Sequence, residues 1–573
     1  MSSIVRRRWS LLVCGLVAVV VALLPAGPAT AAAKAPGTGK PPAGTGIGTA
    51  AALSNTLCDK TQGIAGYGKL DFVIKGGAPD PGGSPICVTA WKKGKDNGGT
   101  TAQGVTKDSV MVVALVPNDQ QASATIAQLR PKNNATGQPG SVQNALSDAL
   151  PAFAHVYESY GRTVDLQYVT SSGDDESAQR ADAVTVIGMK PFAVFDANST
   201  GHPFFEAAVA ADKIPVFGNG ATFDATQKQT PYRWGQSDVQ SSALNVAEFA
   251  GKQLAGKKAQ YAGDSVLHDK TRVLGVVHPD GVIDVNLFNK TLAKYGAKIA
   301  PDATVTYPAS TSTTGDPTVA QQQAPLAVTK LKAAGVTTII LLSDSAFTKA
   351  LLDQATKQDY HPEWVISGFQ NQEFFLTARG YDQDQWSHAF GLSNLPPFSA
   401  ATTTDTSTYD PVQWYWGKNK GTSSATIYTG LNWAMSGIMY AGPKLTPKTF
   451  QQGFFAVPGA GGAPSNSTTS VQHGYGRTAN LPYDEYLRGS QDYTTVWWDP
   501  HTLGPALGAL PPAPGTLWYV NGAKRYYAGH WPTKPLPFFD QSTAIHEGTN
   551  ATPVPVPCKG CPSETGAGGS STG

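Results

Sequence analysis

Short apolar runs alternate with stretches of helical periodicity through most of this chain of 573 residues. Each run has the length and the residue content of a buried β-strand. Strands that alternate with helices over short connections predict parallel sheets with helices on both faces. The alternation is too long for one doubly wound sheet of usual size, so we expect an α/β fold of two lobes. The runs are Val110–Val116, Val164–Val169, Phe192–Asp196, Val273–Val277, Thr337–Ser343 and Trp364–Gly368.

Several segments between these runs carry the pattern of amphipathic helices. The clearest is 281–295, where four apolar side chains fall on one face. Residues 238–254 repeat in the same way behind Asp238, a residue type that caps helix starts. A third helix is expected over 141–160, with a kink at Pro151.

The chain changes character after residue 485. Thr494–Asp499 is rich in β-formers. Leu517–Val520 and Ala523–Tyr527 flank Asn521-Gly522, a pair that suits a two-residue hairpin turn. We expect this segment to complete the second lobe with antiparallel strands.

The first 31 residues read as an export signal. Arg6–Arg8 form a basic start, Leu11–Leu24 an apolar stretch, and Ala29–Ala31 a small-x-small cleavage pattern. An apolar stretch of 14 residues falls short of the roughly 20 needed to span a bilayer, which disfavours a membrane anchor. A lipid anchor on Cys14 is not favoured, and the arginines leave a twin-arginine route open. We expect an exported protein, extracellular, surface-associated or periplasmic.

Charge argues against one class of partner. Charged residues make up 15% of the chain, and the net charge is +2. Loss of the signal's three arginines would leave a net charge of −1. Because no basic field remains, nucleic acid is not expected as a partner.

Four cysteines remain after the signal, and an even number in an exported protein predicts disulfides. Three pairings are possible, of which we favour Cys58–Cys87 and Cys558–Cys561. A redox site at the second pair is disfavoured because it lies in a proline-rich tail with no strand–helix unit around it. We expect no metal, since no pair of histidines has zinc-ligand spacing.

Signatures of common enzymes are missing from the predicted α/β region. No Gly-x-Ser-x-Gly elbow follows a predicted strand, and the sequence has no His-Glu-x-x-His or Gly-x-x-x-x-Gly-Lys-Ser/Thr motif. Asp174-Asp175-Glu176 are expected to open a helix over about 176–187, where acidic groups complement the positive helix end. His278 follows a strand and is expected to be solvated. We therefore expect no catalytic residues.

Two strand ends are better candidates for a ligand site. The strand ending at Asp196 is followed by Ser199 and Thr200, and then by a helix that starts near His202-Pro203. Free backbone N–H groups at such a start hold anions, although plain helix capping would leave the same pattern. The next strand, 215–218, is followed by small residues and then Ala221 and Thr222. The carboxyl ends of adjacent parallel strands form the usual ligand crevice of open α/β sheets.

The order of these elements resembles the type I periplasmic binding proteins, specifically the branched-chain amino-acid receptors of ABC importers. The resemblance runs from about residue 104 to 450, and less securely to 535. The stretches that carry it are Gly104–Val110, Gly161–Leu166, Lys213–Phe217 followed by Gly220–Thr222, and Tyr232–Trp234.

The resemblance implies two Rossmann-like lobes joined by a multi-strand hinge, with a small ligand held between them. In lobe one the matching positions are Ser199, Thr200, Ala221 and Thr222, which would hold an amino acid's carboxylate and ammonium. In lobe two they are Asp280, Ser343, Asp344 and Gln370. Asp280 stands where the family has Tyr, and Gln370 stands for the Glu that pairs the ammonium. Asp280 or Asp344 could supply that charge, and an amide, sugar-like or aromatic ligand is equally compatible.

The domain layout expected from this resemblance has seven parts. They are a signal peptide at 1–31, a flexible leader and cysteine segment at 32–104, lobe one at 105–235, lobe two at 236–392, a return to lobe one at 393–485, a β-rich segment completing lobe two at 486–549, and a disordered tail at 550–573.

The function implied is capture of a small polar molecule for a membrane ABC permease, by a monomer without a cofactor. A ligand sensor of the same fold is one alternative. A secreted hydrolytic enzyme that uses His278, Asp280 and Asp344 is another.

Overall fold

The computed structural model of the protein describes residues 64–66, 73–75, 91, 94–118, 141–198, 201–218, 229, 231–235, 239–310, 315–397, 428–456, 492–505 and 511–548. The predicted signal peptide, the tail and the cysteines lie outside these residues. Within the described part, no helix is both long and apolar enough to cross a membrane. A two-stranded antiparallel sheet, β1 (Ile64–Gly66) with β2 (Val73–Lys75), precedes the main fold.

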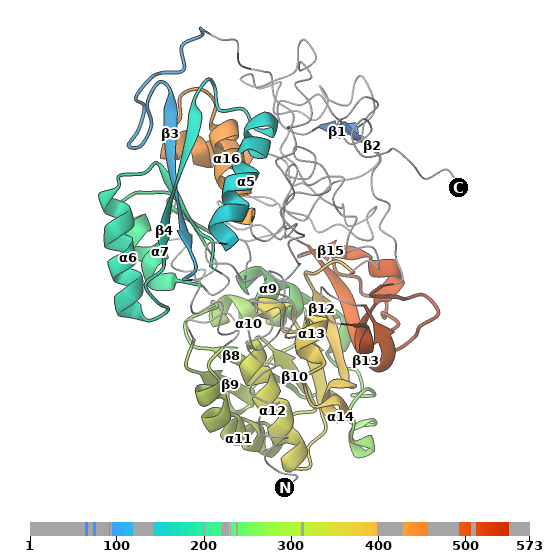
Figure 1. The fold of residues 1–573 in the computed structure, drawn as a ribbon. Coiled ribbons are helices and arrows are strands. Elements are labelled where there is room, and N and C mark those ends of the chain that lie inside the picture. The colour runs from blue at the N-terminus through green and yellow to red at the C-terminus, as the bar shows by residue number, and fades with distance from the viewer. Residues whose placement is uncertain are drawn as a thin grey trace.

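Lobe one is built on a five-stranded parallel sheet with the order β4-β3-β5-β6-β7. Its helices cover both faces, with α6 and α7 on one side and α5 and α16 on the other (Figure 1). The strands are β3 (Ser109–Val116), β4 (Thr163–Thr170), β5 (Ala193–Asp196), β6 (Val216–Gly218) and β7 (Arg233–Gly235). The helices are α5 (Ser141–Val156), α6 (Glu176–Gly188), α7 (Pro203–Ala211), α16 (Thr429–Ala441) and α17 (Pro447–Ala456).

Lobe two is built on a nine-stranded mixed sheet. Strands β9-β8-β10-β11-β12 are parallel, and β13, β14 and β16 extend them antiparallel, with β15 also paired to β13. The strands are β8 (Leu274–Pro279), β9 (Thr304–Tyr307), β10 (Thr338–Leu341), β11 (Glu363–Ile366), β12 (Ala389–Ser393), β13 (Asp492–Gly504), β14 (Ala513–Tyr519), β15 (Arg525–Tyr527) and β16 (Ile545–His546). The helices are α9 (Val239–Phe249), continued by a π-helix to Leu254, then α10 (Val285–Lys294), α11 (Pro317–Ala333), α12 (Ser345–Lys357), α13 (Phe375–Ala378) and α14 (Gln383–Trp386), with short 3₁₀ turns between elements.

Alternation along the strands places apolar side chains on both faces of each sheet. In β3, Val112 and Ala114 face the core beneath α5 and α16, whereas Val113 and Leu115 face the core beneath α6 and α7. This two-sided burial is typical of a parallel sheet covered by helices. The α/β fold of two parallel-rich sheets predicted from the sequence is confirmed.

The structure corrects the expected hairpin after residue 517. β14 and β15 do not pair with each other, because both pair with β13 in the same direction. Asn521, Gly522 and Ala523 adopt left-handed backbone angles. They form a short bulge between two segments that continue along one partner strand rather than a reversal.

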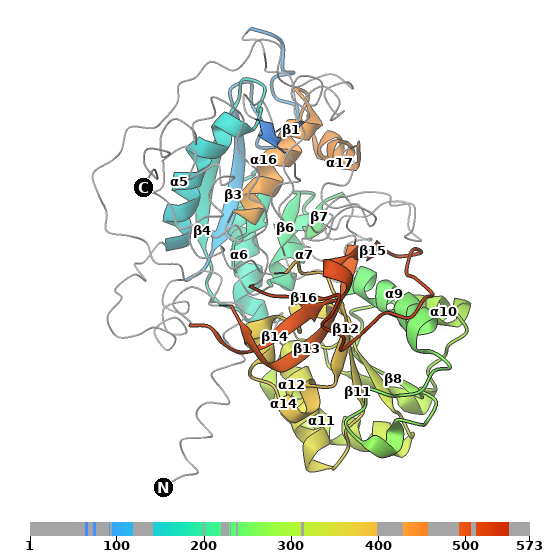
Figure 2. The same cartoon turned by 90° about the vertical axis from the view of Figure 1, so that its right-hand side faces the viewer.

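The chain passes between the lobes at the carboxyl ends of the parallel strands. From β7 it reaches α9 through only three residues, so Gly235 and Val239 lie within about 14 Å of each other. It leaves β12 at its carboxyl end for α16, whose Gly430 packs on Phe195 in lobe one. It returns from α17 to β13, which pairs with β12. The carboxyl edges are therefore the edges from which each lobe connects to the other (Figure 2).

Candidate functional site

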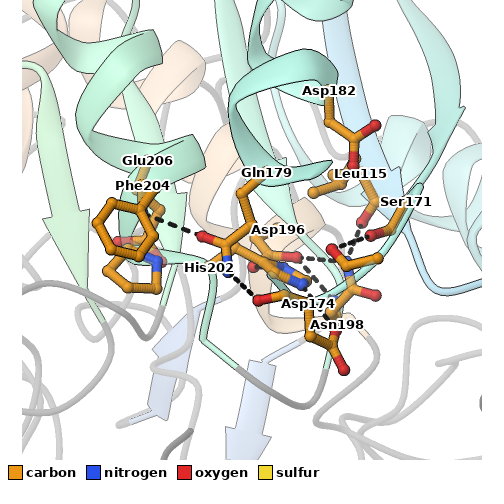
Figure 3. Close-up of polar contacts among 12 residues, drawn as sticks. Leu115, Ser171, Asp174, Gln179, Asp182, Asp196, Asn198, His202, Phe204 and Glu206 are labelled. Carbon is orange, nitrogen blue, oxygen red and sulfur yellow. Dashed lines mark hydrogen bonds and ion pairs between the residues drawn. The ribbon is translucent and has the colours of Figure 1, made fainter. Parts of the chain in front are cut away.

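A polar network occupies the carboxyl edge of the lobe-one sheet, where the sequence predicted a ligand site. Its side chains come from the loops after β4 and β5 and from the first turns of α6 and α7 (Figure 3). We call it the His202 network, comprising Asp174, Gln179, Asp196, Asn198 and His202. Every member except Asp174 is buried.

Asp196 ends β5 and organises the turn that follows. Its Oδ1 accepts hydrogen bonds from the backbone N–H of Asn198 at 2.9 Å and from the Asn198 side chain at 2.6 Å. Its Oδ2 lies 2.8 Å from Nδ1 of His202. The Asn198 amide also donates to the carbonyl of Leu115 in β3. The two oxygens of one buried carboxylate thus bind residues on both sides of positions 199–200.

His202 connects this turn to the neighbouring loop. Its ring is fully buried, and its Nε2 lies 3.2 Å from the carboxylate of Asp174, whose side chain is 63% exposed. Burial alone would lower the pKa of His202, but the two carboxylates outweigh it and raise the pKa to about 9. The imidazole is therefore protonated at neutral pH and donates from both nitrogens.

Gln179 and Asp182 in α6 complete the tie between the two loops. Gln179 donates to the carbonyl of Asp174 at 2.7 Å and accepts from the N–H of Phe204 in α7 at 3.0 Å. Asp182 accepts both the backbone N–H and the hydroxyl of Ser172. As the sequence predicted, the acidic run opens α6, with Asp175 capping the N–H of Ala178.

A buried ion pair lies beside the network, beneath the end of β6. Nη2 of Arg233 in β7 lies 3.2 Å from Glu206 in α7 and donates to the carbonyl of Pro203. Gly218 packs so closely on Glu206 that a Cβ there would lie 2.2 Å from its Oε1. A larger residue at this end of β6 would displace the Glu206 side chain from its present position.

The carboxyl edge of lobe two is built differently, around Asp344. This residue caps α12 by accepting the N–H of Phe347 at 2.8 Å, and it accepts the Tyr307 hydroxyl at 2.7 Å. The same hydroxyl accepts the backbone N–H of Asp344. Gly315 packs directly against the Asp344 carboxylate, so a Cβ at position 315 would overlap it. Burial raises the pKa of Asp344.

The other predicted lobe-two positions occupy different environments. Asp280 is exposed at the end of β8. Ser343 is fully buried, and its hydroxyl lies 2.9 Å from that of Thr348. Gln370 is half-buried in a left-handed conformation.

His278, expected to be solvated, is instead buried in β8, so that expectation was wrong. The strand continues to Pro279, two residues beyond the end of its predicted apolar run, and this places the ring inside. Its nitrogens face the carbonyl of Pro279 and the hydroxyl of Thr306. Burial lowers its pKa, which keeps the ring neutral.

The structure brings Asp280, Ser343 and Asp344 to one edge of the lobe-two sheet, at the ends of β8 and β10. Ser199, Thr200, Ala221 and Thr222 lie outside the described residues. Sequence reasoning did not single out His202 beyond its place at a helix start. Its signal was a histidine directly before the helix-starting proline and six residues after a strand-ending aspartate.

Among the described residues of the two edges, His202, His278 and Asp344 are each engaged with other protein groups. His202 is protonated and buried between two carboxylates, so it has no free nitrogen to accept a proton. Within the residues that the structure describes, no group of three His, Cys, Asp or Glu side chains could hold a metal ion.

Comparison with known proteins gives likenesses among solved structures alone. No family model matches the sequence. No curated protein matches it either. A solute-binding protein of an ABC transporter from Rhodopseudomonas palustris HaA2, in complex with p-hydroxybenzoic acid, is similar at 13% identity and a TM-score of 0.43. That likeness covers 74% of this chain and 98% of the other.

Two further structures are similar to the same degree. One is a leucine-, isoleucine-, valine-, threonine- and alanine-binding protein from Brucella ovis, at 12% identity and a TM-score of 0.43, covering 71% of this chain and 95% of that one. The other is a fatty acid ABC transporter substrate-binding protein from Thermomonospora curvata, at 13% identity and a TM-score of 0.42, covering 76% and 99%. The fold assignment rests on the strand order and the crossings described above.

Proposed function

We propose that this chain is an exported solute-binding protein that captures a small polar molecule between its lobes and delivers it to a membrane ABC permease. The observation that carries the proposal is the position of the crossings. They leave both sheets at their carboxyl edges, the edges at which open α/β sheets bind ligands. A ligand that touched both edges would favour the closed arrangement of the lobes over the open one.

The two edges contribute different chemistry to such a site. In lobe one, the His202 network ties His202 to Asp196 and Asp174, and the predicted ligand positions Ser199 and Thr200 fall between Asp196 and His202 in the sequence. In lobe two, the carboxylate of Asp344 is already engaged by Tyr307 and Phe347. Asp280 is exposed, so it is the better candidate to pair a cationic group of the ligand.

A thermal-shift screen of residues 32–573 tests the proposal. Amino acids, amides, sugars, polyamines and aromatic acids would be the probes. A ligand at 100 times its Kd stabilises a protein by about 2.7 kcal/mol, a readily visible shift. Stabilisation by one class, saturating with concentration, is the expected result. If no probe from any class shifts the melting temperature, the proposal loses its support.

Two substitutions then locate the site. Thr222→Ala should weaken binding by about 1–3 kcal/mol if its hydroxyl contacts the ligand. Asp280→Asn should weaken binding of a cationic probe and leave that of a neutral probe unchanged. Asp302→Asn, which changes an exposed carboxylate away from the carboxyl edge, is the matched control. Equal affinities by calorimetry for all three variants and the wild type would remove Thr222 and Asp280 from the site.

Transport is separable from binding. Cells that lack the gene should lose uptake of the radiolabelled ligand found in the screen and regain it with the wild-type gene. Unimpaired uptake would favour a sensor of the same fold. Turnover of the bound compound, lost in Asp280→Asn, would favour an enzyme.

A further inference from the structure

Arg525 lies at the point where two of the three crossings meet lobe two. It begins β15 and is fully buried. Its Nη2 donates to the carbonyls of Asn394 at 2.9 Å and Asp492 at 2.8 Å, and its Nη1 donates to the carbonyl of Leu395 at 3.3 Å. Its Nε is 3.0 Å from the Asp492 carboxylate.

These acceptors belong to chain segments that run in opposite directions between the lobes. Asn394 and Leu395 directly follow β12, on the way to α16. Asp492 is the first residue of β13, on the way back from α17. One guanidinium therefore joins the outgoing and the returning crossing, beside the paired residues Ser393 and Thr494.

The remaining crossing, from β7 to α9, is bound to β13 next to Asp492. The hydroxyl of Tyr493 in β13 lies 2.9 Å from that of Ser242 in the first turn of α9, and both are buried. Three residues separate the start of α9 from the end of β7 in lobe one. Figure 2 shows β15 and α9 at the side of lobe two nearest lobe one.

Two buried acids, Glu373 and Glu547, lie close to the outgoing crossing. Glu373 accepts the hydroxyl of Ser393 at 2.5 Å through Oε1, while its Oε2 is buried with no hydrogen-bond partner among the described residues. The Tyr519 hydroxyl lies 3.2 Å from Glu547 and 3.3 Å from the carbonyl of Pro396 in the outgoing crossing. Both acids are fully buried.

We infer that Arg525 is a clamp that holds the crossings together at lobe two, and that Glu373 and Glu547 beneath it loosen the clamp as pH rises. A guanidinium suits this task because its planar fork serves several carbonyls at once, which a lysine ammonium cannot do in the same geometry. Since hinges are short segments that absorb backbone change, a clamp on them sets how freely the lobes move.

The pH response follows from the groups that face the two acids. Burial raises the pKa of Glu373 and of Glu547 to about 7. Tyr519 lies between them and near Arg525, and Arg379 faces Glu547. The Arg525 charge is already paired with Asp492. Above pH 7 the ionised acids therefore add buried negative charge, which Arg379 offsets in part at Glu547, whereas no cation among these groups faces Glu373.

Hydrogen exchange measured on the full-length protein without ligand tests the clamp. In Arg525→Lys, amide exchange should rise at least tenfold both at 393–395 and at 492–495. Arg272→Lys is the matched control, because Arg272 forms a buried pair with Glu363 at the opposite edge of the same sheet. Equal acceleration in both variants, or acceleration in one crossing alone, would overturn the clamp. Should Arg525→Lys fail to fold, Asp492→Asn, which keeps the main-chain carbonyl, should produce a smaller rise in both crossings.

A second series tests the acids. In the wild type, exchange at both crossings, corrected for the intrinsic rate, should rise between pH 5.5 and 8. Glu373→Gln and Glu547→Gln should each flatten part of that rise, and unchanged slopes in both would contradict their role. The further step, in which a loosened clamp lets the lobes open, rests on the proposed function. The exchange experiment needs no ligand, so an empty ligand screen with a positive clamp result would end only the proposed function.

Discussion

The five parallel strands of each lobe have the same order, but the polar groups at their carboxyl edges differ. The lobe-one edge holds a buried imidazolium, His202, between the side chains of Asp196 and Asp174. The lobe-two edge combines the buried Arg525–Asp492 ion pair with acids whose pKa values burial raises, among them Asp344 and Glu373. The fold therefore places polar residues at these edges without dictating their charge state.

The difference sets separate pH windows for the two lobes. His202 has a folded pKa of about 9, above its ordinary value, so its stabilising contribution is complete at low pH and is lost as pH rises to 9. Glu373 and Glu547 have folded pKa values of about 7, so each destabilises the fold as pH rises from about 4.5 to 7. As pH rises, lobe two should lose stability first, and lobe one should lose stability at higher pH.

The largest effect is expected from removing the buried anion of lobe one. Asp196→Ala leaves the imidazolium with only its exposed partner and should cost about 3–5 kcal/mol, as loss of one member of a buried ion pair does. Asp344→Ala removes a cap and an acceptor with a raised pKa, and should cost only about 1–3 kcal/mol. Denaturant unfolding followed by lobe-specific hydrogen exchange measures both. A greater loss in Asp344→Ala would reverse the comparison.

The next effect is the pH dependence itself. A pKa displaced from 4.5 to about 7 corresponds to at most about 3 kcal/mol for Glu373. Calorimetry at pH 5, 7 and 9 should show lobe two weakening between the first two values and lobe one between the last two. Glu373→Gln should reduce the first loss and His202→Gln the second. If both lobes lost stability over the same pH interval, the assignment of one interval to each lobe would be wrong.

A smaller effect is expected from the Tyr307 hydroxyl, which donates to Asp344 and accepts from its N–H. Tyr307→Phe should cost about 1–2 kcal/mol, because two buried polar groups lose a partner. The lobe-one comparison is Tyr157→Phe, which removes one bond to Asn432. Thermal melts would contradict the expectation if Tyr307→Phe were the milder change.

The smallest effect is expected from Asp174, because its side chain is largely exposed. Asp174→Ala should cost less than about 1 kcal/mol, as exposed pairs do. It should also lower the pKa of His202, read by NMR titration of the ring, yet leave it above 6.5 because Asp196 remains. A pKa below 6.5 would give Asp174 the larger role.

The strand and helix pattern was enough to predict the fold because each element carries its own signal. The six apolar runs predicted as strands correspond to β3, β4, β5, β8, β10 and β11, and the strand predicted at 215–218 is β6. β9 and β12 were not predicted. β9 alternates polar threonines over only four residues, and β12 carries Gly391 at its centre, where a Cβ would collide with the Ile366 carbonyl. Short strands without an apolar run leave little periodicity to read.

The site was less predictable because its contacts join distant parts of the chain. Asp174 and His202 are 28 residues apart, and Tyr307 and Asp344 are 37 apart. No residue pattern close to either member of these pairs in the sequence predicts its partner. By contrast, the capping role of Asp344 has a local signal, an aspartate directly before a helix, which competes with its interpretation as a ligand residue.

The three-residue link from Gly235 to Val239 also has a kinematic consequence. Any rotation of one lobe against the other must keep these ends within about 14 Å, so the rotation axis has to pass close to the link. Fluorophore pairs placed beside the axis will barely change their separation. A pair with one fluorophore on α6 in lobe one and the other on α12 in lobe two will report the rotation between the lobes.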